Sequence, residues 1–216
     1  MLDLTDWNGK KDIKSMTPEE VTEELAALGE KSFRAKQLYE WMHVKLAKGF
    51  DDMSSLSKGL REKLGEIYSF TCLELVEERI SKVDGTRKYL FGLEDGNVIE
   101  SVWMQYHHGN SVCISSQVGC RMGCRFCAST LDGLERNLRP SEMLEQIYRI
   151  QALTGERVSN VVVMGSGSLW ITMIMWCGFC VSFPMKTGSI SARGISPFPP
   201  AAWFPRSTDL QRRACL

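Results

Sequence analysis

The chain has 216 residues, 44% of them hydrophobic, and its 26 Lys+Arg offset its 26 Asp+Glu to a formal net charge of zero. Such a chain can form one moderate domain, or a small domain joined to a larger one. A zero net charge produces no global field, so a nucleic-acid partner must be bound through local basic patches. Four arginines are candidates for such a patch: Arg121, Arg125, Arg136 and Arg139. No apolar run reaches the ~18 residues needed to cross a bilayer, and the start lacks a secretory signal, so we expect a cytoplasmic protein without membrane contact.

The first third of the chain follows a helical period. Thr17-Pro18-Glu19-Glu20 combines an N-cap threonine, a proline at the first helical position and a capping-box glutamate, which together predict the start of a helix. Apolar residues recur at helical spacing over 33–48 and again over 55–67. We therefore expect residues 1–68 to form a small helical accessory domain.

The hydrophobic period then changes to two, which is typical of strands. Three strands are predicted, over 72–80, 88–93 and 98–104, with Asp84-Gly85 and Asp95-Gly96 as the hairpin turns between them. Residues 69–106 are therefore expected to form an antiparallel β linker.

A different pattern occupies residues 107–167. A strand over 111–115, a helix over 140–153 and a fully apolar strand over 158–164 predict a βαβ unit of a parallel sheet. The fold class we expect is thus α/β, with a helical domain and a β linker followed by the first part of a (β/α) barrel.

Three of the eight cysteines lie within eight residues, at Cys120, Cys124 and Cys127. Thiolates this dense are usually metal ligands, and their free state requires a reducing compartment. Three ligands leave one position open on a four-coordinate centre, which favours an iron–sulfur cluster with one free iron over a closed zinc site. The alternative is a zinc knuckle whose fourth ligand is Cys113 or the His107/His108 pair, although zinc ribbons usually use paired Cys-x-x-Cys elements.

The residues around these cysteines resemble a known family. The cysteine spacing, with Phe126 before the last cysteine, resembles the radical S-adenosylmethionine signature. The wider run over 113–138 is similar to the adenine-C2 methyltransferases that act on 23S ribosomal RNA and transfer RNA. Segments 33–41, 53–58 and 158–165 resemble the same family, so the resemblance extends from the helical domain to the end of the βαβ pattern.

The resemblance implies a set of cofactors and partners. It implies a [4Fe-4S] cluster on the three cysteines, and S-adenosyl-L-methionine bound by Phe126, Gly165 and Gly167. It also implies a monomer that binds ribosomal RNA and transfer RNA, assisted by the helical accessory domain, and receives electrons from a donor such as a flavodoxin or ferredoxin.

The resemblance further implies a two-stage methylation. One S-adenosylmethionine methylates a C-terminal cysteine, and a second supplies the radical that activates this methyl group for addition to the adenine ring. Cys113 matches the cysteine that resolves the covalent protein–RNA intermediate, and Glu100 matches the base that removes the C2 proton. Outside this context, Cys113 would more often be a small buried apolar residue and Glu100 a solvated carboxylate.

The pattern of the family stops after Gly167. The family continues Gly-x-Gly with Glu-Pro-Leu, whereas this chain has Ser168-Leu169-Trp170. If one base is missing from the gene, plausible codons for this stretch regroup to Glu-Pro-Leu-Asp-Asn-Tyr-Asp-Asn-Val-Val-Arg-Phe. Residues 168–216 also contain only one acidic residue, Asp209, and show no periodicity. We therefore interpret this segment as an out-of-frame tail.

An out-of-frame tail removes the methyl-carrying cysteine, and its role should not be given to Cys177, Cys180 or Cys215. We expect a chain of low solubility that by itself transfers no methyl group. Two alternatives remain open on the sequence: a zinc-stabilised RNA-binding module without enzymatic activity, and a pseudogene product without function.

Overall fold

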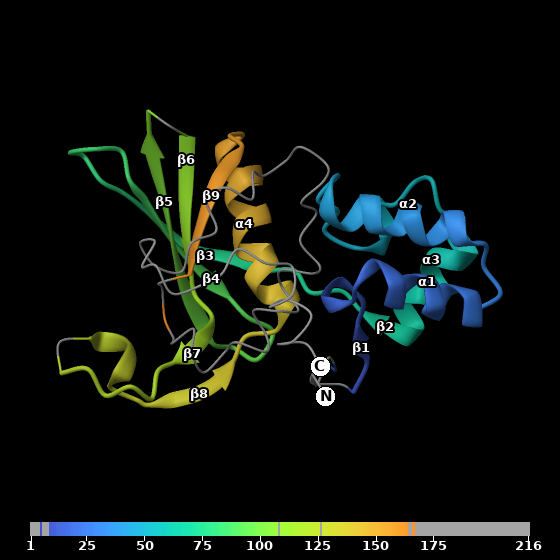
Figure 1. Ribbon diagram of the computed structural model, residues 1–216, viewed down its shortest axis with the longest axis horizontal. Coiled ribbons are helices and arrows are strands. Elements are labelled where there is room, and N and C mark those ends of the chain that lie inside the picture. Colours follow the sequence, from blue (N-terminus) through green and yellow to red (C-terminus); the bar gives the residue numbers. More distant parts are fainter. Residues whose placement is uncertain (1–4, 6–8, 108, 126, 164–165, 167–216) are drawn as a thin grey trace, which may run out of the picture.

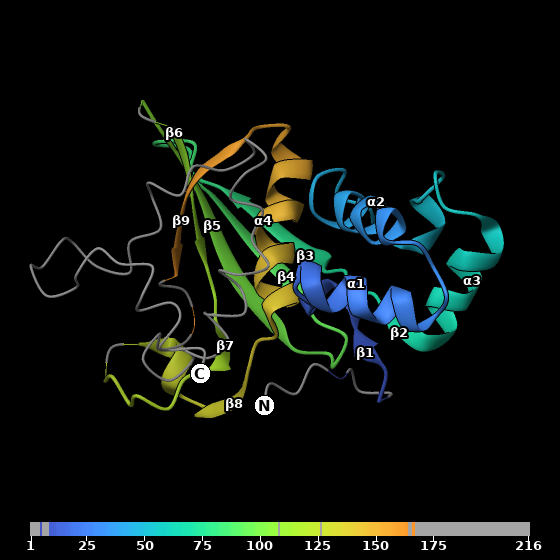
Figure 2. The same cartoon turned by 45° about the vertical axis from the view of Figure 1, so that its right-hand side comes forward.

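The computed structural model describes residues 5, 9–107, 109–125, 127–163 and 166. Their elements form a helical bundle beside a five-stranded sheet, and helix α4 (Pro140–Thr154) lies between the two (Figure 1). Turning the molecule by 45° leaves α4 in this middle position (Figure 2). One side of α4 therefore faces the sheet and the other faces the bundle.

The bundle contains three α-helices: α1 (Pro18–Ala27), α2 (Ser32–His43) and α3 (Lys58–Ile67). Short 3₁₀ turns, η1 (Ile13–Ser15) and η2 (Phe50–Asp52), connect the helices to the rest of the chain. A parallel pair of two-residue strands, β1 (Lys11–Asp12) and β2 (Tyr68–Ser69), joins the two ends of the bundle. Apolar side chains at helical spacing fill the core, among them Val21, Leu25, Leu38, Met42, Leu60 and Leu64.

The predicted start of α1 is confirmed. Glu20 N donates to Thr17 Oγ1 at 3.2 Å, and Thr17 N donates to Glu20 Oε2 at 2.8 Å. Both bonds satisfy amides that a helix start leaves without intrahelical partners.

Removing this cap should lower stability by a measurable amount. Thr17→Ala deletes the accepting hydroxyl, so we expect the free energy of unfolding in urea to fall by about 1 kcal/mol. Thr22→Ala is the matched control, because the Thr22 hydroxyl bonds to the Pro18 carbonyl within the same helix, and alanine there favours the helix. Equal losses for both variants would contradict the capping role.

Two helix boundaries differ from the predicted ones. Helix α2 ends at His43 instead of continuing to 48, because Leu46 adopts a left-handed φ of 56° that breaks the helical path. Helix α3 begins at Lys58 instead of 55, because the side chain of Ser57 caps the free amide of Leu60.

The sheet consists of β3 (Glu74–Ile80), β4 (Arg87–Gly92), β5 (Val98–Tyr106), β6 (Gly109–Ile114) and β9 (Val158–Val163), in that spatial order. The first four strands pair antiparallel, whereas β6 and β9 pair parallel across α4. The parallel pair confirms the predicted βαβ unit. The three strands predicted as a linker thus continue directly into the sheet of that unit.

The two predicted hairpin turns are present, with glycines at φ 72° (Gly85) and 83° (Gly96). Positive φ at these positions favours glycine over any residue with a side chain.

One face of the sheet packs on α4. Alternate residues of the strands point toward the helix and form the core with it, including Tyr89, Phe91, Ile99, Trp103, Val112 and Ile114 from the strands and Met143, Leu144, Ile147 and Ile150 from α4. Because strand side chains alternate, the residues between them lie on the opposite face, which no described helix covers. None of the described helices is long and apolar enough to cross a membrane.

Buried polar contacts join the bundle to α4. Lys14 Nζ of η1 lies 2.6 Å from Glu145 Oε1, and both side chains are almost fully buried. His43 Nδ1 of α2 lies 2.9 Å from the hydroxyl of Tyr148. The bundle is therefore attached to α4 through directional contacts that exclude water, and not only through apolar packing.

Candidate cluster-binding and catalytic site

The three clustered cysteines lie on a hairpin that the sequence did not predict. Strands β7 (Gln117–Gly119) and β8 (Leu134–Asn137) pair antiparallel, and the short η3 turn (Ala128–Thr130) lies in the loop between them. The hairpin follows directly on β6 and lies at the carboxyl end of that strand (Figure 1). In α/β barrels this end of the sheet carries the active site.

The base of the hairpin is closed tightly. Cys120 N donates to Gly133 O at 2.8 Å. Gly119 has a φ of +69°, and a Cβ there would lie 2.0 Å from the same carbonyl oxygen. Only glycine fits at this position, so the first cysteine is held at a fixed point where the loop leaves the sheet.

The three thiols differ in exposure. Cys120 is buried, Cys127 is half-buried and Cys124 is exposed, and all three are free of disulfides. Cys127 N donates to Cys124 O at 3.1 Å, and the hydroxyl of Thr130 donates to Cys127 O at 2.8 Å, so these bonds shape the loop. In the described part of the chain, no three His, Cys, Asp or Glu side chains are grouped as metal ligands.

The donor set still fits the expected cluster better than a zinc ion. Three soft thiols on one loop match the ligands of an iron–sulfur cluster that leaves one iron open. A structural zinc site needs a fourth protein ligand. Of the candidates for that ligand, Cys113 lies on strand β6 of the main sheet, and His108 lies outside the described residues.

The cysteine hairpin meets the segment that follows β9. The hydroxyls of Ser129 and Ser166 lie 3.2 Å apart. Ser116 N and Gln117 N both donate to Ser166 O, at 2.9 and 3.1 Å, and Ser166 N donates to Ser115 Oγ at 3.0 Å. The ends of β6 and β9 are thereby held together beside the cysteine loop.

The residues expected to bind the cofactor cannot be placed in the same way. Phe126, Gly165 and Gly167 lie outside the described residues. Their neighbour Ser166 is described, and it contacts the cysteine hairpin. The sequence reasoning overlooked Ser129 and Ser166, because no sequence pattern brings together residues 37 positions apart.

The two candidate catalytic residues lie on the helix-free face of the sheet. Cys113 of β6 pairs directly with Val102 of β5. Glu100 stands two residues before Val102 and therefore on the same face. This arrangement makes Glu100 and Cys113 diagonal neighbours across two strands, at a Cα separation of about 7–8 Å. A carboxylate and a thiol can then approach the same flat ligand from one surface.

A lysine that sequence reasoning missed pairs with Glu100. Lys88 Nζ of β4 lies 2.6 Å from Glu100 Oε2, and both side chains are nearly half exposed. The signal that could have found it is strand alternation, which places Lys88 on the same face of β4 as Glu100 occupies on β5. The ion pair places the positive charge of Lys88 beside the Glu100 carboxylate, so a ligand that binds Glu100 also lies close to Lys88.

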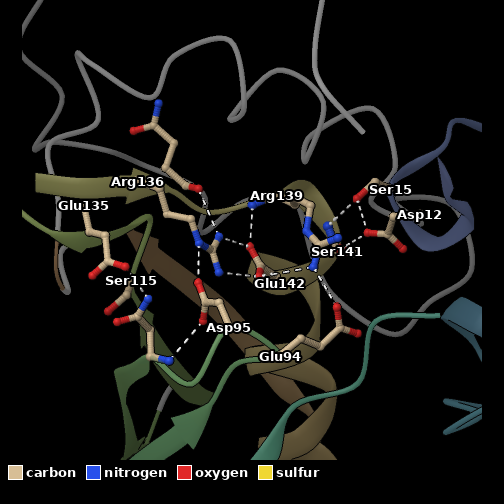
Figure 3. A network of polar contacts seen from close by, with 12 residues as sticks. Asp12, Ser15, Glu94, Asp95, Ser115, Glu135, Arg136, Arg139, Ser141 and Glu142 are labelled. Carbon is tan, nitrogen blue, oxygen red and sulfur yellow. Dashed lines mark hydrogen bonds and ion pairs between the residues drawn. The ribbon is translucent and has the colours of Figure 1, made fainter. Parts of the chain in front are cut away.

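Two of the four arginines expected to form an RNA-binding patch are instead part of the interior. The side chain of Arg136 is 18% exposed and contacts Asp95 and Glu142, and that of Arg139 is 9% exposed and contacts Glu142 (Figure 3). That prediction is wrong for both, because their charges are already neutralised by buried carboxylates. Arg121 and Arg125 remain exposed at the cysteine loop.

Burial and carboxylates act in opposite directions on Arg136. Burial alone would lower the pKa of its guanidinium, but hydrogen bonds to Glu142 and Asp95 outweigh burial and raise that pKa above its usual value. The side chain therefore carries a permanent charge within the interior.

Comparisons with known proteins identify what the chain and its fold are similar to. Residues 11–69 match the family described as the ribosomal RNA large subunit methyltransferase N-terminal domain. A radical SAM methyltransferase from Sphaerobacter thermophilus has a similar structure, with a TM-score of 0.74 and 36% sequence identity over 82% of this chain and 52% of that one. The α/β fold class is thus confirmed, and the fold is similar to that of a radical SAM methyltransferase.

Two relatives make the resemblance more specific. The probable dual-specificity RNA methyltransferase RlmN of Lachnospira eligens is 69% identical over 156 residues, which is 72% of this chain and 45% of that protein. The corresponding protein of Lachnoclostridium phytofermentans is 64% identical over 158 residues, 73% of this chain and 44% of its own length. The resemblance expected from the cysteine motif is therefore confirmed, and the chain spans less than half the length of these relatives.

Proposed function

We propose that this chain is the cluster-binding part of a radical SAM methyltransferase that methylates C2 of adenine in 23S ribosomal RNA and transfer RNA. The observation that carries the proposal is the position of the three-cysteine hairpin at the carboxyl ends of β6 and β9. The 69% identity to a probable dual-specificity RNA methyltransferase supports it. Because the relatives extend well beyond the matched region, the complete reaction requires parts that the match does not include.

In this proposal, Cys120, Cys124 and Cys127 hold a [4Fe-4S] cluster. Phe126, Gly165 and Gly167 bind S-adenosyl-L-methionine. When bound, the cluster supplies the electron that starts radical chemistry, which adenine C2 requires because it offers no lone pair for polar methyl transfer. The electron comes from a donor such as a flavodoxin or ferredoxin, and the protein works as a cytoplasmic monomer.

Residues of the helix-free face act on the RNA base. Glu100 accepts the proton from adenine C2, and the thiol of Cys113 resolves the covalent protein–RNA intermediate. Their diagonal placement on neighbouring strands supports this division of roles. Lys88 Nζ lies 2.6 Å from Glu100 Oε2 and orients the carboxylate on this face.

The organisation of the chain follows from these roles. We assign residues 1–68 to a helical accessory domain that contributes to RNA binding, residues 69–106 to a β linker, and residues 107–167 to the radical SAM part. Residues 168–216 lie beyond the described β9 segment, and their loss of the family pattern supports an out-of-frame tail. A chain with such a tail lacks the methyl-carrying cysteine and is inactive by itself.

Anaerobic reconstitution with iron and sulfide tests the proposal. We expect the full chain to retain iron with acid-labile sulfide, and to lose it when Cys120, Cys124 or Cys127 is changed to alanine. Cys72→Ala is the control, because that thiol lies outside the hairpin. Stoichiometric zinc without sulfide would support the zinc module instead. Methylated adenine in an RNA substrate would contradict the proposed inactivity of this chain.

A further inference from the structure

A cluster of charged side chains from β8, α4 and the β4–β5 turn lies at the base of the cysteine hairpin (Figure 3). Arg136 on β8 makes two parallel hydrogen bonds to Glu142 in the first turn of α4, at 2.8 and 2.9 Å. Its Nε bonds to Asp95 in the β4–β5 turn at 2.6 Å. One guanidinium therefore joins three elements: the strand that returns from the cysteine loop, the start of the barrel helix and a hairpin turn of the sheet.

The partners of Arg136 are themselves fixed. Glu142 also accepts a hydrogen bond from the backbone N of Arg139 at 2.7 Å, which completes the start of α4. The next residue toward the N-terminus, Ser141, donates through its backbone N to Ser15 Oγ at 3.1 Å and bonds through its hydroxyl to Asp12 of the helical bundle. The start of α4 is thus held from the bundle side and provides a rigid reference point for β8.

The hairpin needs such an anchor. A two-stranded hairpin by itself is at best marginally stable in water. Strand β7 is held through Ser116 and Gln117, which bond to the segment after β9. On the β8 side, Leu138 N donates to Ser116 O, and the planar fork of Arg136 is the charged contact with α4. A bidentate arginine–carboxylate pair fixes orientation as well as distance.

We propose that Arg136, acting with Glu142, is a positioning residue that holds the returning strand of the cysteine hairpin and thereby sets the arrangement of the loop that carries Cys120, Cys124 and Cys127. What the loop holds rests on the proposed function, whereas the anchoring of the loop does not. The pair touches no reacting atom and acts only through β8.

Thiol reactivity in the metal-free chain measures this anchoring. Cys120 is 6% exposed, so an alkylating reagent reaches it only when the hairpin opens. Arg136→Lys keeps the charge but loses the bidentate bond. We expect the alkylation rate of Cys120 to increase at least about tenfold, which is the effect of losing one buried charged hydrogen bond. Mass spectrometry measures the alkylation of each cysteine over time. Alkylation of Cys72 should not change.

Two further variants keep the test decisive. Asp95→Asn is milder, because it leaves the pair between Arg136 and Glu142 in place. It should increase the alkylation rate of Cys120 by less than Arg136→Lys does. Arg79→Lys alters an exposed arginine–glutamate pair of the same sheet, with side chains 70% and 42% exposed, and should leave Cys120 unchanged. The positioning role is wrong if Arg136→Lys increases the alkylation rates of Cys120 and Cys72 equally. It is also wrong if Arg136→Lys increases the alkylation rate of Cys120 no more than Arg79→Lys does.

A spectroscopic measurement separates positioning from plain stability. In the reconstituted chain, Arg136→Lys should change the electron paramagnetic resonance signal of the reduced cluster, while Arg79→Lys keeps the parent signal. An unchanged signal in Arg136→Lys would overturn the claim that the pair sets the arrangement of the three thiols. Failure of every variant to bind iron, together with faster Cys120 alkylation, would instead reject the proposed function and leave the anchoring intact.

Discussion

Lys14→Met is expected to lower the free energy of unfolding by about 2–3 kcal/mol, because the buried Glu145 carboxylate loses its shortest ion pair and keeps only the longer contacts with Arg149 Nε and Leu73 N, both at 3.3 Å. The two side chains are 0% and 4% exposed, and their charged atoms lie 2.6 Å apart. The Lys14 ammonium also donates to Thr71 O at 3.1 Å and lies 4.2 Å from the centre of the Phe70 ring. Both side chains are buried away from bulk solvent, so losing the ammonium removes contacts that lie inside the protein.

Urea unfolding followed by circular dichroism measures this loss. Lys58→Met is the matched control, because the Lys58–Glu62 pair is exposed at 82% and 63% and such pairs contribute about 0–1 kcal/mol. The double variant Lys14→Met/Glu145→Met should recover part of the lost stability, since it removes both charges of the buried pair but also the contacts of Glu145 with Arg149 and Leu73 N. A loss in Lys14→Met no larger than that in Lys58→Met would show that water reaches the interface between the bundle and α4.

Acid should destabilise this same interface through His43. Burial is the main cause that lowers the pKa of His43 from 6.5 to about 3, and the nearby Lys14 charge lowers it further. Between these two values the unfolded chain binds a proton that the folded chain does not. The free energy of unfolding should therefore fall as the pH drops below 6.5, by about 1.4 kcal/mol per pH unit from this residue alone.

The neutral imidazole has a defined place between two tyrosines. Its Nδ1 bonds to the Tyr148 hydroxyl, and its ring centre lies 4.2 Å from that of Tyr39. Burial raises the pKa of both phenols, to about 12 for Tyr39 and well above the usual value for Tyr148, so neither can supply a negative charge in acid. A protonated His43 would thus face Lys14 and two neutral hydroxyl groups.

His43→Gln isolates this contribution. Glutamine keeps a polar group that can bond to Tyr148 and does not titrate. Between pH 6.5 and about pH 5, the parent chain should lose about 1.5–2 kcal/mol more than His43→Gln does, measured by urea unfolding at each pH. Parallel pH profiles for the two proteins would mean that His43 binds its proton as readily in the folded chain as in the unfolded chain, which would contradict this prediction.

Local sequence signals predicted most elements of the fold. The capping box at Thr17, the two glycine turns and the βαβ pattern all appear in the structure, because each depends on neighbours within one turn or one strand. The failures at the ends of α2 and α3 have local causes too, namely the φ of Leu46 and the cap by Ser57. The β7–β8 hairpin was missed, since its strands are three and four residues long and carry no clear alternation.

The cysteine motif and the pattern around it predicted the class of protein that this chain resembles. Three cysteines at this spacing, inside a longer family pattern, predict an iron–sulfur cluster, because ligand identity is a property of residue type and short spacing. The pairing of Glu100 with Lys88, its placement beside Cys113 and the meeting of Ser129 with Ser166 depended on strand register and on the return of the chain at β9.

The roles of the arginines depend on contacts that form only in the folded chain. Arg136 and Arg139 are positively charged residues of the kind that bind RNA, yet carboxylates of the distant β4–β5 turn and of nearby Glu142 neutralise them in the folded chain. Lys14 and His43 likewise owe their expected effects to partners on α4 more than 100 residues away. The sequence shows which side chains are charged. The contribution of each charge to stability depends on its burial and its partners, and both arise only when the chain has folded.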